Sequence, residues 1–269
     1  MRHLSVQHAG QRSVQRSVPG PVLLVVAHGS RDPRHAATVH ALAGRLRVLR
    51  PGLRVETGFL DFNTPAVPRL LDRLALEGVR EVVALPLLLT RAFHAKADIP
   101  AVLREARARH PYPLIRQAEV LGPSPLLVEA LERRLYEAGL RAADRASTGV
   151  VLASAGSSDP EAAAVIAGIA REWRRTGGWR AVRPAFASAA LPRTEDAVRA
   201  LRAEGVRRIA VAPYVIAPGF LPDRIANGAR ESGADVLAPV LGAAPELARL
   251  LLRRYDERVA SAGPVPVSA

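Results

Sequence analysis

The sequence contains no cysteine among its 269 residues. A disulfide framework, a thiolate metal site and a cysteine nucleophile are therefore all excluded. Any metal ion that this chain binds must be held by histidine, aspartate or glutamate.

Aromatic residues and long apolar runs are also scarce. Only 4% of the residues are aromatic, although 49% are hydrophobic. No uninterrupted apolar stretch approaches the roughly 20 residues that are needed to cross a bilayer. These features indicate a soluble globular protein that does not span a membrane.

Positive charge is in excess, with a formal net charge of +13. Such a balance suits a polyanionic partner: nucleic acid, phosphate or a small molecule with several carboxylates. Nucleic acid is disfavoured, because no basic stripe is interleaved with aromatic side chains on which bases could stack. Arginine far outnumbers lysine and alanine is abundant, a usage typical of GC-rich genomes, so much of the charge is expected on solvated surface.

The two ends of the chain differ from the rest in composition. Residues 1–20 contain no acidic residue, and they lack the apolar core of roughly 7 to 15 residues that a secretory signal requires. We therefore expect a disordered tail and a cytoplasmic protein. Residues 259–269 are similarly small and proline-bearing and are interpreted as a second tail.

Between the tails, apolar β-rich runs alternate with segments of helical apolar spacing, such as residues 68–78. Near-continuous apolar strands joined by helices are typical of parallel sheets that are covered on both faces. The predicted strands fall into two sets, at 22–27, 54–60, 81–89 and 114–120, and at 149–154, 181–187, 208–216 and 235–240.

The two sets are copies of one another. At a constant shift of 127 positions, residues 22–100 align without a gap with residues 149–227. The alignment pairs Gly29 with Gly156, Ser30 with Ser157, Asp32 with Asp159, Pro33 with Pro160 and Phe59 with Phe186. A duplication of this length favours two similar parallel-sheet α/β domains over a single barrel. We predict domains at 21–144 and 145–258, with the active site in the cleft between them.

The duplication separates shared structure from chemistry, because a single active site needs its reactive residues in only one copy. Three polar residues of the first copy are replaced by inert ones in the second: His28 by Ala155, Asp61 by Ser188 and His94 by Leu221. All three lie at or just after the carboxyl end of a predicted strand, where open α/β sheets bind ligands. This set suits a divalent metal such as Fe, Co, Ni or Zn, and a neutral imidazole there is equally suited to accept a proton.

Taken singly, each of these residues has a structural alternative. A histidine at a strand end often bonds only a neighbouring backbone group, and Asp61 is placed to cap the following turn. The joint pattern favours the functional interpretation, since three chemically competent residues at neighbouring strand ends are all absent from the other copy. The remaining histidines are interpreted as structural or tail residues: His3, His8, His35, His40 and His110.

Three segments resemble a known family: AHGSRDP at 27–33, GFLDFNTP at 58–65 and FHAKADIP at 93–100. They are similar to the motifs of the sirohydrochlorin chelatases, cobalt or iron chelatases of the class II chelatase fold, and the similarity extends over residues 22–258. The resemblance implies insertion of Co²⁺ or Fe²⁺ into sirohydrochlorin, in cobalamin or siroheme synthesis. The metal is then a substrate, with no tightly bound cofactor, and the partner is a small tetrapyrrole rather than nucleic acid or a membrane.

The resemblance also assigns the metal ligands. The two histidines of the family fall on His28 and His94, and its acid, commonly glutamate, falls on Asp61. Aspartate is one methylene shorter, so either the metal sits slightly deeper or Asp61 reaches it through water. Short members of the family supply two copies of one domain as a homodimer, so this duplicated chain is expected to be a monomer with pseudo-dimeric halves.

Sirohydrochlorin carries several carboxylates, which a basic cleft would attract and pair with. Arg31 in the first segment, with Arg91 and Lys96 around the third, are placed to bind them, although single basic residues in loops are often merely solvated. Gly29 and Ser30 recur in the second copy, which indicates that they shape the turn or bind a substrate edge. Ser30 is not expected to be a nucleophile, because no G-x-S-x-G elbow is present.

Two other functions remain open. A metal or tetrapyrrole carrier without turnover would use the same ligands and would give no more than stoichiometric metallated product. A histidine-phosphatase-like enzyme ranks lower, because its RHG motif is not matched where Ala27 precedes His28. The residues leave open which metal is physiological among Co, Fe and Ni, and which pathway the protein serves.

Overall fold

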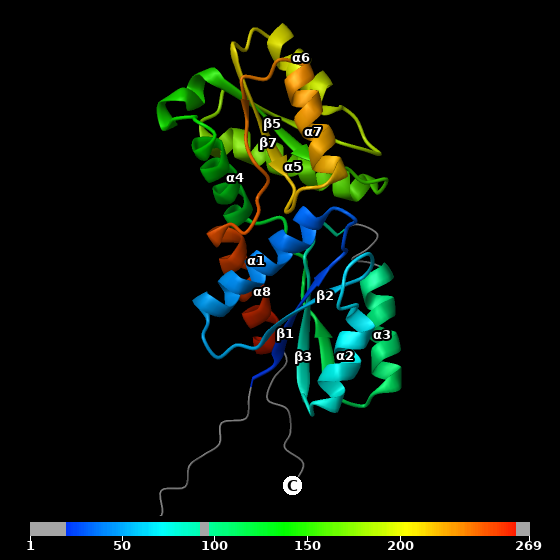
Figure 1. Cartoon of the computed structure of the whole chain (residues 1–269). Helices are drawn as coiled ribbons and strands as arrows, with labels where there is room; N and C mark the ends of the chain where they lie inside the picture. The colour runs from blue at the N-terminus through cyan, green and yellow to red at the C-terminus, as the bar shows by residue number, and fades with distance from the viewer. Residues whose placement is uncertain (1–19, 92–96, 262–269) are drawn as a thin grey trace, which may run out of the picture.

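The computed structural model describes residues 20–91 and 97–261. Its architecture is two four-stranded parallel sheets, each covered by helices (Figure 1). The predicted fold class of two similar parallel-sheet α/β halves is confirmed. Within the described residues, no helix is long and apolar enough to cross a membrane.

The first sheet has the strand order β2-β1-β3-β4. Its strands are β1 (Val22–Ala27), β2 (Val55–Phe59), β3 (Glu81–Pro86) and β4 (Leu114–Gln117). The helices that follow these strands in turn are α1 (Pro33–Leu49), α2 (Val67–Leu76), α3 (Ile99–Arg109) and α4 (Pro125–Glu137).

The second sheet repeats this topology, with the strand order β6-β5-β7-β8. A short 3-10 helix over Ala142–Ser147 leads into it. Its strands are β5 (Thr148–Ser154), β6 (Ala181–Phe186), β7 (Arg208–Tyr214) and β8 (Val236–Leu237). The helices are α5 (Pro160–Gly177), α6 (Thr194–Ala203), α7 (Phe220–Glu231) and α8 (Pro245–Ala260).

Four strands, β3, β4, β7 and β8, end two or three residues before their predicted ends, and the cavity explains two of these differences. β3 ends at Pro86 and β7 ends at Tyr214, whereas the predicted strands continued to residues 89 and 216. The extra apolar residues leave the sheet and line a cavity between the two halves. Their hydrophobicity reflects the wall of this cavity rather than strand pairing.

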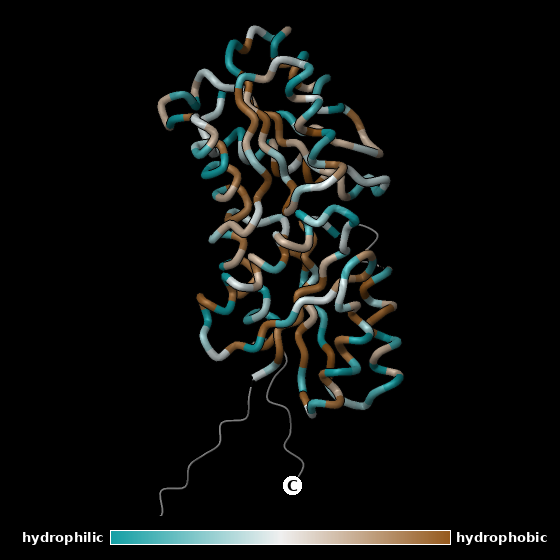
Figure 2. Tube along the Cα trace, in the orientation of Figure 1, coloured by the Kyte–Doolittle hydropathy of each residue, from teal (hydrophilic) through white to brown (hydrophobic). Residues whose placement is uncertain are grey.

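The strand β1 is buried along its whole length because helices cover both faces of its sheet. Leu23 and Val25 pack in the cluster that contains residues of α1 and α8, whereas Leu24 and Val26 pack in the cluster that contains residues of α2 and α3. Successive side chains of a strand point to opposite faces, which explains this alternation. In Figure 2 the hydrophobic colour follows the strands of both sheets.

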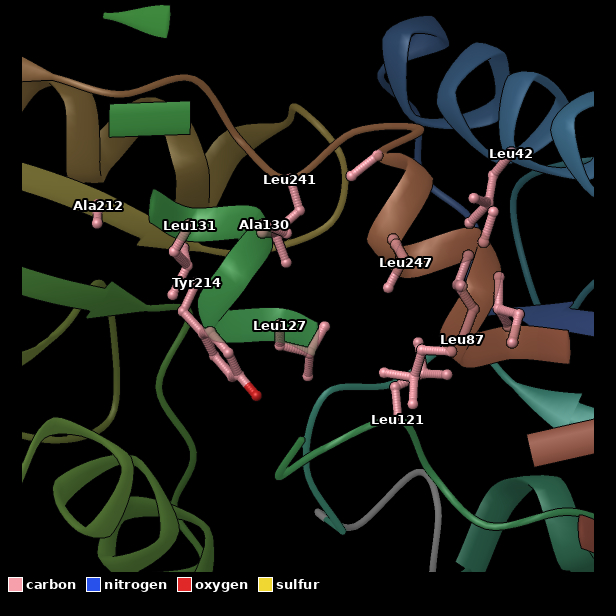
Figure 3. Close-up of a cluster of buried hydrophobic side chains, with 14 of the residues drawn as sticks. Leu42, Leu87, Leu121, Leu127, Ala130, Leu131, Ala212, Tyr214, Leu241 and Leu247 are labelled. Atoms are coloured by element: carbon pink, nitrogen blue, oxygen red, sulfur yellow. The ribbon is translucent and has the colours of Figure 1, made fainter. Parts of the chain in front are cut away.

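The last helix of each half packs against the other half. α4 contacts β7 of the second sheet, and α8 contacts both α1 and β3 of the first. Figure 3 shows Leu131 of α4 near Tyr214 of β7, and it shows Leu247 of α8 on the side of the cluster where Leu42 of α1 lies. One hydrophobic cluster therefore extends through both halves. The two halves thus exchange their last helices. The sequence repeat alone does not reveal this exchange, because α4 and α8 occupy equivalent places in their own copies.

A partly buried ion pair joins the two exchanged helices. Arg133 of α4 donates hydrogen bonds to both carboxylate oxygens of Glu246 of α8, at 3.1 to 3.2 Å. The Glu246 side chain is only 10% exposed. Burial by itself raises the pKa of Glu246. The hydrogen bonds from Arg133, a backbone hydrogen bond and the charges of Arg133 and Arg249 together outweigh burial, so the pKa lies below its usual value.

We predict that Glu246→Gln lowers the free energy of unfolding at neutral pH by about 1 to 3 kcal/mol, because Arg133 loses a charged acceptor. The folded-state pKa of Glu246 is below the ordinary value of 4.5, so its stabilisation is present above that value and is lost as the pH falls through the folded pKa. Urea denaturation of both proteins between neutral and acidic pH should show the difference shrinking. Glu257→Gln, which alters an exposed carboxylate on the same helix, is the control and should cost less than about 1 kcal/mol.

Candidate functional site

The carboxyl ends of β1, β3, β5 and β7 meet around a cavity of about 470 Å³ between the two halves. This volume lies in the range of about 300 to 1,000 Å³ that is usual for small-molecule sites. Both halves contribute equivalent segments to the wall, which is mostly apolar. The polar residues that line it include His28, Ser30, His35, Thr90, Ser154, Ser157 and Tyr214.

The turn after β1 is built by a close approach of two backbone segments. Gly29 has a φ of +96°, and a Cβ at this position would lie 1.9 Å from the carbonyl oxygen of Asp61. The backbone N–H of Asp61 donates to the carbonyl oxygen of His28 at 2.9 Å. The backbone N–H of Ser30 donates to Oδ1 of Asn63 at 2.8 Å. These contacts bring the predicted ligands His28 and Asp61 to adjacent strand ends.

The second copy repeats this backbone arrangement. A Cβ on Gly156, whose φ is +89°, would also lie 1.9 Å from a carbonyl oxygen, here that of Ser188. The backbone N–H of Ser188 donates to the carbonyl oxygen of Ala155 at 3.0 Å. Gly29 and its counterpart therefore shape the same turn in both halves, whereas the side chains at the tip differ.

The serine and aspartate of the repeated motif also have a structural role. Ser30 Oγ accepts the backbone N–H of Asp32, and Ser157 Oγ accepts that of Asp159, both at 3.1 Å. Each aspartate then caps the helix that follows, because its side chain accepts a backbone N–H in the first turn of α1 or α5. Any contact of Ser30 with a substrate stays a prediction.

His28 and Asp61 are both exposed at the carboxyl edge of the sheet. The ring of His28 lies 6.3 Å from that of Phe62, measured between centroids, and the Arg31 guanidinium lies 5.3 Å from the Phe62 centroid. Asp61 Oδ1 accepts the backbone N–H of Phe62 at 2.8 Å. One carboxylate oxygen of Asp61 thus stabilises the turn, as its structural interpretation anticipates.

The other predicted site residues are not brought together by the described structure. His94 and Lys96 lie outside the described residues, so their placement stays a prediction. Arg91 is exposed and forms an ion pair with Glu119. Across residues 20–91 and 97–261, no group of three histidine, aspartate or glutamate side chains is close enough to hold a metal ion, so a three-ligand site would depend on His94.

His35 is a cavity residue that the sequence interpretation treated as structural. It lies in the first turn of α1, lines the cavity, and its buried Nδ1 has no hydrogen-bond partner within the described part of the chain. Burial, followed by the charge of His28, lowers the pKa of His35. The sequence duplication could have indicated a functional role for His35, because the shift that pairs His28 with Ala155 also pairs His35 with Ala162.

Tyr214 is a second polar residue that the sequence did not indicate. It ends β7, lines the cavity and is 2% exposed, and its hydroxyl has no hydrogen-bond partner among the residues described. Burial raises the pKa of Tyr214, so the hydroxyl stays protonated and is a potential donor. The equivalent residue of the first copy is Leu87, so here the second copy carries the polar group.

An ion pair connects the two halves beside the cavity. Arg34 Nη2 in the first turn of α1 lies 2.7 Å from Asp223 Oδ2 in the first turn of α7. The same guanidinium bonds Asp32, the capping residue of α1. The first turns of two helices from opposite halves are thereby held close together.

Comparison with known proteins identifies the family. Residues 22–138 and 149–258 match the CbiX family model. The chain belongs to the CbiX family. A sirohydrochlorin cobaltochelatase of Priestia megaterium is 28% identical over 243 residues, which cover 87% of this chain and 79% of that protein. A sirohydrochlorin ferrochelatase of the same species is 26% identical, over 90% of this chain and 91% of that protein.

A solved structure has the same two-halved fold. SirB from Bacillus subtilis with Fe³⁺ matches this structure with a TM-score of 0.79 at 25% sequence identity, over 90% of this chain and 96% of that one. The family predicted from the three sequence segments is confirmed, and the two Priestia megaterium relatives are named as chelatases of the predicted class.

We predict that Gly29→Ala and Gly156→Ala each destabilise the protein by more than about 1 kcal/mol, because alanine is strained at a positive φ and its Cβ would meet a carbonyl oxygen 1.9 Å away in either copy. Chemical denaturation of the two variants should give similar losses. Full stability of Gly29→Ala would contradict a structural role for this glycine. Gly44→Ala in α1 is the control, because a Cβ there meets nothing within 4 Å, and it should be neutral or stabilising by up to about 1 kcal/mol.

Proposed function

We propose that this protein is a sirohydrochlorin chelatase that inserts Co²⁺ or Fe²⁺ into its tetrapyrrole substrate in the cavity between the halves. The observation that carries this proposal is the placement of His28 in the wall of that cavity, with Asp61 at the adjacent strand end. The second copy has the same backbone there but carries Ala155 and Ser188. The proposed reactive residues therefore come from the first half alone, although both halves line the cavity.

The proposed metal site consists of His28, His94 and Asp61. Two imidazoles and a carboxylate suit divalent metals of borderline softness. Such a set leaves coordination positions open, so the metal can pass from the protein to the macrocycle, whereas a closed tetrahedral site would retain it. Asp61 either binds directly or acts through water, and its hydrogen bond to the turn is compatible with both. The metal is a substrate here and not a resident cofactor.

Metal insertion also requires proton removal. The metal-free macrocycle carries two inner N–H protons, which must leave as the divalent cation enters. A neutral imidazole near the ring centre can accept one of them, but an imidazole that donates its lone pair to the metal cannot do so at the same time. The site therefore needs more basic groups than the metal ligands alone.

We propose that the carboxylates of the substrate pair with Arg31, Arg91 and Lys96, and that Gly29 and Ser30 contact its edge. Arg31 is exposed and lies over Phe62 beside His28. The excess of positive charge would raise the encounter rate with a polycarboxylate. Tyr214 lines the cavity from the opposite half.

The two copies then have different tasks. We propose that the unit 21–144 carries the chemistry and that the unit 145–258 supplies the facing wall, in a monomer whose halves imitate a dimer. A cytoplasmic location agrees with biosynthetic work on a small molecule. The alternative of a carrier without turnover uses the same ligands, and repeated turnover by a substoichiometric amount of protein would exclude it.

We predict that His28→Ala lowers the rate of metallation of sirohydrochlorin about 100-fold or more, with a comparable loss in His94→Ala. Asp61→Asn should cost about tenfold, because its contact with the metal is indirect or long. The visible spectrum, followed with Co²⁺, Fe²⁺, Ni²⁺ and Zn²⁺ separately, measures the rate. His110→Ala is the control, since its ring pairs with Asp72, and unchanged rates in both His28→Ala and His94→Ala would refute the site.

We predict that Arg31→Ala raises KM for the tetrapyrrole about two- to fivefold and leaves kcat unchanged, because an exposed guanidinium binds the substrate carboxylates without touching the reacting atoms. The effect should shrink at high salt, where surface charges are screened. Arg69→Ala removes one charge from an exposed position on α2 and should leave KM unchanged. Equal changes in the two variants would point to net charge instead of a specific contact.

A further inference from the structure

The first turn of α1 points a histidine into the cavity. Asp32 and Pro33 begin this helix, and the backbone N–H of His35 donates to the carbonyl oxygen of Asp32 at 3.1 Å. The helix start therefore has a defined position relative to the turn that carries His28. His35 and His28 line the same cavity.

The imidazole of His35 is partly buried and incompletely bonded. Its Nδ1 is covered from solvent and makes no hydrogen bond with any described residue. A buried polar atom without a partner is costly, and such atoms occur mainly where a ligand or a functional role compensates. The other ring nitrogen, Nε2, is not among the covered atoms, so it is the atom of this cavity-lining imidazole that a bound molecule can reach.

The second copy shows that the fold does not need a histidine here. The equivalent position of α5 is Ala162, which lines the same cavity from the other half. Both helices begin with the same aspartate cap and proline. The imidazole is thus an addition to one copy, as it is at His28, and its presence is better explained by chemistry than by packing.

We propose that His35 is a further catalytic residue, whose Nε2 accepts an inner pyrrole N–H proton from the tetrapyrrole during metal insertion. In this step the N–H bond breaks, its electron pair stays on the ring nitrogen and then binds the entering cation, and the proton forms a new N–H bond on His35. The ring proton of the neutral imidazole is then on Nδ1. The inference rests on the chelatase function proposed above, and it assigns to His35 a role that metal-bound His28 cannot fulfil.

The test compares His35→Ala and His35→Gln with the wild-type chain. His35→Ala reproduces the residue that α5 tolerates at Ala162, so the variant is expected to fold. We expect kcat for cobalt insertion to fall about 100-fold in both variants, with little change in KM. Affinity for Co²⁺ alone and affinity for cobalt-loaded sirohydrochlorin, which has no inner N–H protons, should stay within about twofold of wild type.

His40→Gln is the matched control, because His40 lies on the same helix with its ring against Phe59 and should keep wild-type kcat. A kcat within twofold of wild type in both His35 variants would overturn the inference, while active wild-type protein would leave the chelatase proposal intact. A parallel loss of Co²⁺ affinity would also overturn it, because His35 would then be a metal ligand. Absence of metallation by wild-type protein would refute the chelatase function and this inference with it.

Discussion

The exchange of α4 and α8 is the constraint on which the rest of this structure depends. α4 follows the strands of the first sheet but packs against the second half, and α8 follows the strands of the second sheet but packs against the first half. The resulting hydrophobic cluster includes residues of both sheets. Separating the halves would expose the apolar faces of two helices at once, at a cost that scales with the area uncovered. The carboxyl ends of β1, β3, β5 and β7 are consequently held around one cavity.

The two copies have the same backbone geometry at the turn after their first strand, but they differ in the side chains that this turn carries. Gly29 and Gly156 both admit a carbonyl oxygen into the space that a Cβ would occupy, so neither copy can change this residue without rebuilding its turn. The residue just before the glycine has no such restriction, and it is histidine in one copy and alanine in the other. A cavity with two similar walls can therefore have a single reactive edge.

The positive charge of the protein lies mainly on its surface and not in the cavity wall. Many arginines are engaged on the surface, as in the pairs Arg50–Asp256 and Arg183–Glu204, which agrees with the expectation of scattered solvated charge. The cavity wall is mostly apolar and carries only a few polar groups. Such a wall suits the apolar faces of a flat ligand.

Much of the fold was predictable because its signals are local or repeat along the chain. Alternating apolar runs locate the strands, and the aspartate–proline caps locate the starts of α1 and α5. The ends of β3 and β7 were predicted too late, because residues that line a buried cavity are as apolar as residues in a buried strand. The left-handed backbone of Phe62, with a φ of 61°, was not predicted, because no local sequence pattern indicates that conformation for phenylalanine.

The sequence by itself determined the two-copy α/β architecture, the family, and the asymmetry that singles out His28 and Asp61. Tertiary structure alone decided which sheet each terminal helix covers, and that His35 and Tyr214 line one cavity from opposite halves. An amphipathic pattern specifies that a face must be buried but not against which partner. That choice depends on the shapes and distances of surfaces far apart in the chain, which exist only once the chain has folded.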